Sequence, residues 1–127
     1  MRKFITLLVT VLTLVSCNVD KVKDYIYVNS FNASASVPEE EGKAIYDYVT
    51  TIPYFTTQHS YHGTYSETFQ LACDEFQAAI NKLDEEQIVS HLGDGQTFAI
   101  YLVLQENMSP IMAFYFSPDG TEQQDQE

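Results

Sequence analysis

The sequence predicts an α+β domain in which helices pack on one face of a small antiparallel sheet. Two kinds of pattern lead to this prediction: apolar segments rich in Tyr, Ile and Val, typical of strands, and apolar residues three and four positions apart, typical of helices. Along the chain these patterns follow the order β-α-α-α-β-β. The simplest compact arrangement for that order is an antiparallel sheet with the helices on one side.

The first predicted strand covers residues 25–31, where Ile and Val alternate with Tyr. A helix follows after a loop, because Ser36 stands three residues before Glu39 in the pattern of a capping box. Acidic residues fill positions 39–41, the first turn, where the helix dipole favours negative charge. We therefore interpret them as a helix start and not as a metal site. The helix must end shortly before Pro53, which restricts the residue that precedes it.

Two more helices are predicted in the middle of the chain. The longer one covers residues 66–82, where apolar side chains recur at helical spacing on a stripe that includes Cys73. Cys73 is therefore interpreted as a small core residue and not as a nucleophile. A short helix follows, which Asp84 can cap together with Gln87 and which ends at Gly93.

Two strands close the domain. Residues 97–105 are apolar on both faces, which is typical of a central strand. A short turn joins them to residues 111–117, so the pair is predicted to form a hairpin. Residues 118–127 are acidic overall and contain no apolar side chain that could join a core, and we expect them to be a disordered tail.

Residues 1–16 have the layout of a secretory signal peptide. Arg2 and Lys3 are followed by an apolar stretch from about residue 4 to 15 and by the small residue Ser16. A membrane-spanning helix would need about 20 apolar residues, which is more than this stretch provides. We therefore exclude residues 1–16 from the folded domain.

The next residue gives the signal its type. Leu14, Val15, Ser16 and Cys17 resemble the lipobox of bacterial lipoproteins, in which an aliphatic residue stands three positions before the cysteine and a small residue directly before it. The resemblance implies lipidation of the Cys17 thiol, cleavage after Ser16 and acylation of the new amino terminus. Asn18 in the following position implies, by the enterobacterial sorting rule, transfer to the outer membrane.

Such a modification would make the chain a tethered protein of the cell envelope. One acyl chain binds a membrane only reversibly, and stable anchoring takes two signals, which the two or three chains of a lipoprotein supply. The predicted organisation is a signal peptide at 1–16, a lipidated tether at 17–24, one globular domain at 25–117 and the tail. The membrane, bound through lipidated Cys17, is thus the partner that the sequence predicts.

Composition limits the other partners. The chain after residue 16 has four lysines against eighteen carboxylates, a formal charge of −14. Nucleic acid is therefore an unsuitable partner, because phosphate binding needs clustered Lys and Arg. With Cys17 acylated, Cys73 has no partner for an intrachain disulfide. No cofactor motif is present: the glycines are dispersed, and phosphate loops, nucleophile elbows and paired CxxC motifs do not occur.

The segment from residue 54 to 65 carries no charged residue and has four aromatic residues and two histidines. Its tyrosines can form an exposed patch for a protein, peptide or glycan. Its histidines form an H-x-x-H pattern that can bind Zn or Cu. Alternatively, the segment is an additional strand or a packed loop, since Tyr, Phe and Thr are also common in strands. The tyrosines are Tyr54, Tyr61 and Tyr65, and the histidines are His59 and His62.

Two classes of function follow from these alternatives. The first is a lipid-anchored, noncatalytic binding or interaction module that uses this segment or the sheet face. The second is a metal-binding or hydrolytic envelope protein that uses His59 and His62 with a carboxylate such as Glu67. The geometry of residues 54–65 decides between them.

Overall fold

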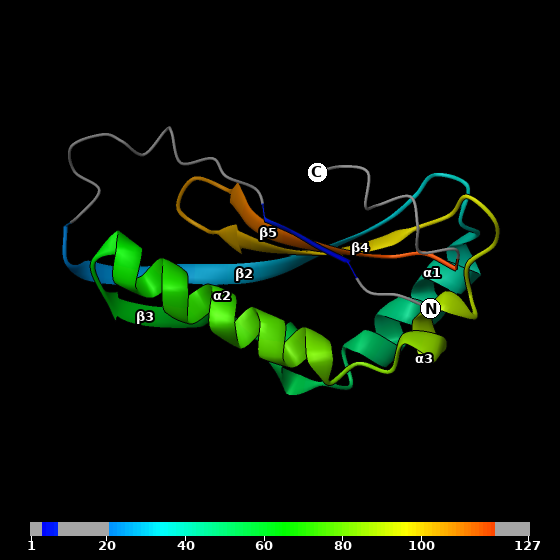
Figure 1. Cartoon of the computed structure of the whole chain (residues 1–127), viewed down its shortest axis with the longest axis horizontal. Helices are drawn as coiled ribbons and strands as arrows, with labels where there is room; N and C mark the ends of the chain where they lie inside the picture. The colour runs from blue at the N-terminus through cyan, green and yellow to red at the C-terminus, as the bar shows by residue number, and fades with distance from the viewer. Residues whose placement is uncertain (1–3, 8–20, 119–127) are drawn as a thin grey trace.

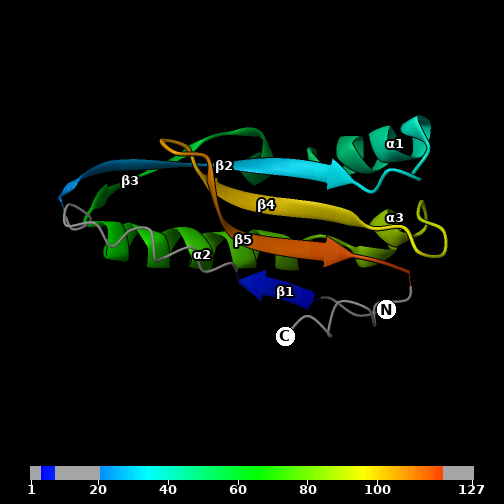
Figure 2. The same ribbon diagram turned by 90° about the horizontal axis from the view of Figure 1, so that it is seen from above.

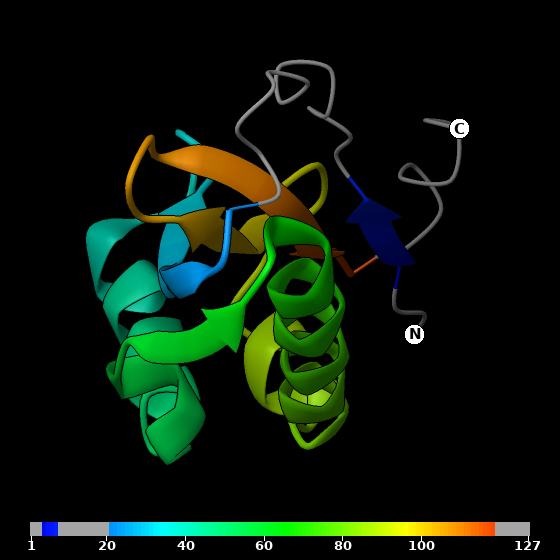
Figure 3. The same ribbon diagram turned by 90° about the vertical axis from the view of Figure 1, so that its left-hand side faces the viewer.

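The computed structural model describes residues 4–7 and 21–118, and its fold is α+β as predicted. Five antiparallel strands form one sheet in the order β1-β5-β4-β2-β3. Helices cover one face of this sheet, and no helix among the described residues covers the other (Figures 1 and 3). The elements are β1 (Phe4–Leu7), β2 (Lys23–Ala33), α1 (Glu39–Val49), the 3-10 helix η2 (Pro53–Thr56), β3 (His59–Gly63), α2 (Tyr65–Asn81), α3 (Glu85–Val89), β4 (Phe98–Leu104) and β5 (Ser109–Phe116).

The strand β4 lies in the middle of the sheet, as its apolar sequence predicts (Figure 2). It pairs with β5 in the predicted hairpin and with β2 on its other side. Opposite Ile100 stand Phe114 on β5 and Phe31 on β2. Every residue of β4 except Tyr101 is buried. A strand that is buried on both faces must carry apolar residues throughout, and this one does.

The strand β2 is longer than the predicted segment of residues 25–31. Its first half, from Lys23 to Tyr27, pairs with β3, and its second half, from Tyr27 to Ala33, pairs with β4. The polar residues of the second half interrupt the apolar alternation that would mark a strand. Backbone pairing with β4 keeps them extended nonetheless.

Two of the three predicted helix starts differ in detail. The helix α1 begins after Pro38 and has no side-chain cap, so the capping box predicted at Ser36 is wrong. The reason is that Pro38 restricts Val37 to extended conformations, and a helix capped by Ser36 would need Val37 in its first turn. The helix α2 begins at Tyr65, one residue before the predicted start, and has a capping box formed by Thr64 and Glu67.

The third helix starts at the predicted cap residue, Asp84, but ends at Val89, four residues before the predicted end at Gly93. The side chain of Asp84 caps α3 by accepting a hydrogen bond from the backbone N–H of Glu86 at 3.1 Å. From β2 onward the element order is the predicted one, with η2 and β3 inserted between α1 and α2.

The core lies between the helices and the face of the sheet that they cover. It includes Phe76 and Ile80 of α2, Ile100 of β4 and Phe114 of β5, all fully buried. Cys73 lies in the same core with 8% of its surface exposed, which confirms its prediction as a core residue.

The strand β1 falls within the segment predicted as a signal peptide. It pairs antiparallel with the outer edge of β5, in a register that places Phe4 opposite Tyr115 and Leu7 opposite Met112. Without β1, the strands from residue 21 onward form a four-stranded sheet with β5 and β3 at its edges. The lipobox residues 14–17 and the tail from 119 lie outside the described residues. In residues 4–7 and 21–118, no helix has the length and apolar character needed to span a membrane.

Candidate functional site

The segment from residue 54 to 65 is folded and contains an additional strand. It begins in η2, continues as β3 and ends where α2 starts. The pairing of β3 with β2 places Tyr61 opposite Tyr25 and His59 opposite Tyr27. Because side chains alternate along a strand, His59 and Tyr61 lie on the face covered by helices, and His62 lies on the other face. Of the three interpretations of this segment, the structure therefore shows the extra strand.

The side chains of Tyr54 and His59 lie against one another. Their rings stack at 4.0 Å between centroids, and His59 Nε2 donates to the backbone carbonyl of Tyr54 at 2.9 Å. Burial raises the pKa of Tyr54 above its ordinary value, and the neighbouring Asn29 amide offsets part of that rise. Yet neither the Tyr54 hydroxyl nor Asn29 Oδ1, both buried, has a hydrogen-bond partner of normal geometry in the described part of the chain.

Tyr61 extends this group toward α2. Its ring packs edge-on against the ring of Tyr27, and its hydroxyl donates to the carboxylate of Glu75 on α2. Burial, followed by this hydrogen bond, raises the pKa of Tyr61. The charge of Glu75 also raises the pKa of Tyr54, so the two tyrosines belong to one continuous group. We call Asn29, Tyr54, His59, Tyr61 and Glu75 the aromatic cluster.

Tyr65 is separate from this cluster. It is the first residue of α2, and its ring packs edge-on against Tyr25 at 5.9 Å and close to Phe69. Burial raises the pKa of its hydroxyl. Tyr54, Tyr61 and Tyr65 are all partly buried. The first two of these predicted binding residues belong to the aromatic cluster, and the third lies at the start of α2.

The two histidines of the H-x-x-H pattern do not converge. His59 stacks on Tyr54, whereas His62 lies on the opposite face and pairs with Asp24 at 2.8 Å between Nδ1 and Oδ1. Glu67 accepts a hydrogen bond from the backbone N–H of Thr64 at 2.9 Å, and thus caps α2. Across the described residues, no group of three His, Cys, Asp or Glu side chains is placed to hold a metal ion. The geometry therefore offers the metal-binding alternative no support.

Two other titratable side chains have structural roles. Burial raises the pKa of the Cys73 thiol to about 11, which is the opposite of what a nucleophilic thiolate requires. The third histidine, His91, follows α3; its Nδ1 lies 2.7 Å from Oε1 of Glu41 and links the end of α3 to α1.

A second group of tyrosines lies on the sheet face that no described helix covers. The rings of Tyr101 on β4 and Tyr115 on β5 meet edge-on at 6.3 Å. They neighbour the small residues Ala99 and Ala113 in the same pair of strands. This face is the other surface at which the sequence analysis allowed binding.

Sequence reasoning did not find Asn29 and Glu75 as members of the cluster. Asn29 lies on the same side of β2 as Tyr25, Tyr27 and Phe31, so a polar residue in an inward-facing position was the available signal. Glu75 is an exposed residue of α2 that no pattern distinguishes from the other acidic residues. Only the packing of α2 beside β3 brings it to Tyr61.

Comparison of the chain with protein-family models, with curated proteins and with solved structures found no match in any of the three.

Proposed function

We propose that this chain is a lipid-anchored protein of the cell envelope, held in the outer membrane by acyl chains on Cys17, and that its folded domain is a noncatalytic binding module. The anchor is supported by the sequence alone: two basic residues, a short apolar stretch and the lipobox ending at Cys17 stand in the required order. Two or three acyl chains supply the two signals that stable membrane attachment needs.

The binding role is supported by one observation in the aromatic cluster. The Tyr54 hydroxyl and Asn29 Oδ1 are buried and make no hydrogen bond of normal geometry in the described part of the chain, although the Asn29 side chain lies close enough to the hydroxyl to lower its pKa. Nearly all buried polar groups in folded proteins have a partner, and leaving one unpaired costs about 1–3 kcal/mol. Because both atoms are shielded from solvent, a ligand reaches them only when the surrounding side chains move apart. A bound group that then supplies those hydrogen bonds would recover that cost, and the neighbouring rings of His59 and Tyr61 offer apolar faces for it to pack against.

The chemistry of the cluster also limits the ligand. Glu75 and the formal charge of −14 after residue 16 repel anions, so we propose a neutral or basic segment of a protein, peptide or glycan. A noncatalytic role is consistent with the burial or hydrogen bonding of the side chains that could act as nucleophiles or bases. Cys73 is buried as a thiol, and His59 and His62 are hydrogen-bonded on opposite faces.

The anchor is tested by expressing the full chain and its Cys17→Ala variant and measuring mass and detergent partitioning. We expect acylation and cleavage before Cys17 in the wild type and neither in the variant, while the matched Cys73→Ala variant is acylated like the wild type. A wild-type chain whose mass and partitioning equal those of Cys17→Ala would refute the anchor.

The binding role is tested with the purified anchored protein, first against arrays of glycans and peptides and then by titration of the ligand found. We expect Tyr54→Phe and Tyr61→Ala to weaken binding. For a tyrosine that acts as an interface hot spot the expected loss is about 2 kcal/mol, or about thirtyfold in Kd. Tyr46→Ala is the control, because Tyr46 is an exposed tyrosine on α1 outside the cluster. Equal affinity in all three variants would place the binding elsewhere.

A further inference from the structure

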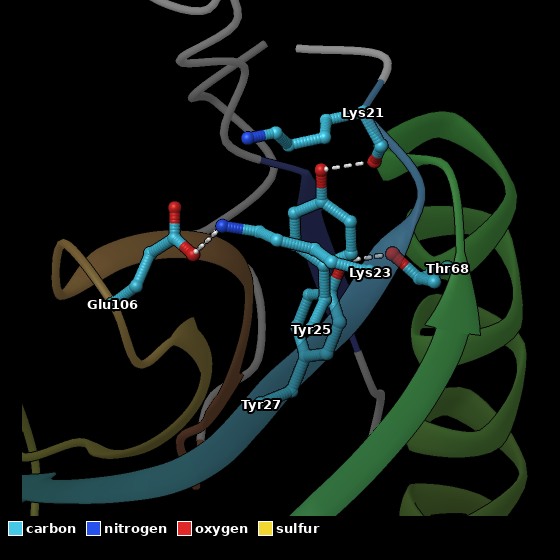
Figure 4. A network of polar contacts seen from close by, with 6 residues as sticks. All are labelled: Lys21, Lys23, Tyr25, Tyr27, Thr68 and Glu106. Atoms are coloured by element: carbon cyan, nitrogen blue, oxygen red, sulfur yellow. Dashed lines mark hydrogen bonds and ion pairs between the residues drawn. The ribbon is translucent and has the colours of Figure 1, made fainter. Parts of the chain in front are cut away.

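Lys21, just before β2, lies at one end of the molecule. The start of β2, the start of α2 and the turn between β4 and β5 meet at this end, and α1 and α3 lie at the opposite end (Figure 1). Figure 4 shows how the residues at the start of β2 are held: the Tyr25 hydroxyl donates to the carbonyl of Lys21 at 2.9 Å, and Lys23 pairs with Glu106 of the turn at 2.8 Å. Lys21 is therefore fixed to the domain.

The distance from this end to the membrane is limited by the chain length before Lys21. Four residue steps separate Cys17 from Lys21, and a fully extended chain covers at most about 14 Å in that length. This limit holds for any conformation of the intervening residues. If Cys17 carries the acyl chains, a premise that rests on the proposed function, the end that includes Lys21 lies within about 14 Å of the lipid surface.

The same end exposes apolar side chains. Four large hydrophobic residues are exposed in the described part of the chain, and two of them, Val22 and Met108, are at this end. They are also the most exposed of the four, at 58% and 63%. Val22 precedes β2 and Met108 lies in the turn after β4, and the ion pair between Lys23 and Glu106 holds these two segments together.

Charge differs between the two ends of the molecule. Near the start of β2, the lysines Lys21 and Lys23 stand with Asp24, Glu67 and Glu106. Each of these carboxylates has a partner: His62 for the first, the backbone of Thr64 for the second and Lys23 for the third. The other ten carboxylates of residues 21–118 lie on the remainder of the domain with only two lysines.

Most of these ten carboxylates lie toward the opposite end of the molecule. The ten are Glu39, Glu40, Glu41 and Asp47 on α1, Asp74 and Glu75 on α2, Asp84, Glu85 and Glu86 at α3, and Asp94. A lipid surface with anionic headgroups repels these carboxylates and attracts each nearby lysine by about 1 kcal/mol. The end that includes Lys21 is thus the one that approaches lipid at the lowest electrostatic cost.

We propose that this end of the domain rests on the membrane surface, with Val22 and Met108 among the lipid headgroups and Lys21 beside the phosphates. The short tether brings the end to the surface, the two apolar side chains gain from leaving water, and the distribution of charge keeps α1 and α3 directed away from the bilayer. The domain then has one fixed orientation relative to the membrane.

The test uses the absence of tryptophan from the chain, which makes a single introduced tryptophan a clean fluorescent reporter. The acylated full-length protein is reconstituted in vesicles of phosphatidylethanolamine and phosphatidylglycerol with brominated acyl chains, which quench tryptophan on contact. We expect Met108→Trp and Val22→Trp to be quenched and their emission to shift to shorter wavelength. Tyr46→Trp is the matched control: Tyr46 is 47% exposed and contacts Phe31, eight residues along β2 from Lys23 and hence roughly 25 Å away.

The outcomes separate this inference from the proposed function, because acylation is measured by mass on the same samples. Acylated protein with quenching of Met108→Trp and Val22→Trp and none of Tyr46→Trp supports the orientation. Acylated protein in which no reporter is quenched, or in which all three are quenched equally, overturns the orientation and leaves the anchor intact. Protein that is not acylated at Cys17 overturns the anchor and the orientation together.

Discussion

The buried hydrogen bond between Tyr27 and Thr68 joins the sheet to α2, and its removal has a calculable cost. Tyr27 is completely buried, as is Thr68, and their hydroxyl oxygens are 2.9 Å apart (Figure 4). The Thr68 hydroxyl donates its only proton to the backbone carbonyl of Tyr65 at 3.1 Å. Tyr27 must therefore be the donor in the bond between the two side chains.

This direction makes the two single substitutions unequal. Tyr27→Phe removes the donor and leaves Thr68 with its bond to the carbonyl of Tyr65, so we expect a loss of about 1 kcal/mol, the net value of one ordinary hydrogen bond. Thr68→Val leaves the Tyr27 hydroxyl buried without an acceptor, so we expect a loss of about 2 kcal/mol. In the double variant no polar group is left unpaired at this point, and its cost should fall about 1 kcal/mol below the sum of the two.

The measurement is urea unfolding of the three variants and the wild type at neutral pH, followed by circular dichroism. A difference of 1 kcal/mol corresponds to about 4–8 °C in Tm for a domain of this size, so thermal unfolding gives an independent check. Equal costs for the two single substitutions, or costs that add within about 0.3–0.5 kcal/mol, would refute the reasoning.

Other predictions concern the two candidate chemistries and the start of α2. Cys73→Ala should cost about 1 kcal/mol as a small core truncation, and native Cys73 should react slowly with a thiol reagent at neutral pH. Because burial raises the pKa of this thiol from 9.0 to about 11, its contribution to stability is complete below pH 9.0 and is lost as the pH rises through 11; the Cys73→Ala variant should lack that part of the alkaline decline in urea unfolding. Calorimetric titration with Zn should detect no stoichiometric submicromolar site, and such a site, if it disappeared on replacing both His59 and His62 by Ala, would restore the metal-binding hypothesis. Gly63→Ala should lower Tm, because Gly63 has a φ of 152° and an added Cβ would lie 2.7 Å from Oε1 of Glu67 in the capping box; an unchanged Tm would show that α2 does not depend on this cap.

Strong periodic patterns predicted most of the fold. Residues 97–105 were apolar enough to indicate the central strand, and the stripe that includes Cys73 indicated α2. Local chemistry decided the boundaries, and there the result was mixed. The capping pattern at Ser36 was overridden by Pro38, whereas the equivalent pattern of Thr64 and Glu67 was present in the sequence and does start a helix.

The candidate site was harder to predict because it depends on contacts between distant segments. The spacing of His59 and His62 would place both on one side of a helix but places them on opposite sides of a strand, so their role depended on an element type that the sequence left open. The contact between Tyr61 and Glu75 depends on how α2 lies beside β3, which no local pattern encodes. Tyr54, Tyr61 and Tyr65 could be identified as a group of tyrosines, but not divided between two places.

The pairing of β1 with β5 has a consequence for the timing of biosynthesis. Its register joins Phe4 to Tyr115, so the pair can form only after the chain has left the ribosome as far as Tyr115. If residues 1–16 are a signal peptide, as proposed, an export machinery that engages them during synthesis would meet residues 4–7 unpaired. A machinery that acts after β5 has folded would have to compete with the sheet for them. The proposed cleavage before Cys17 would remove β1 and expose the edge of β5. Residues 109–118 have no charged side chain, and an uncharged edge of this kind readily accepts another strand. Export after folding would therefore keep this edge paired with β1, and the proposed cleavage would expose it only at the membrane.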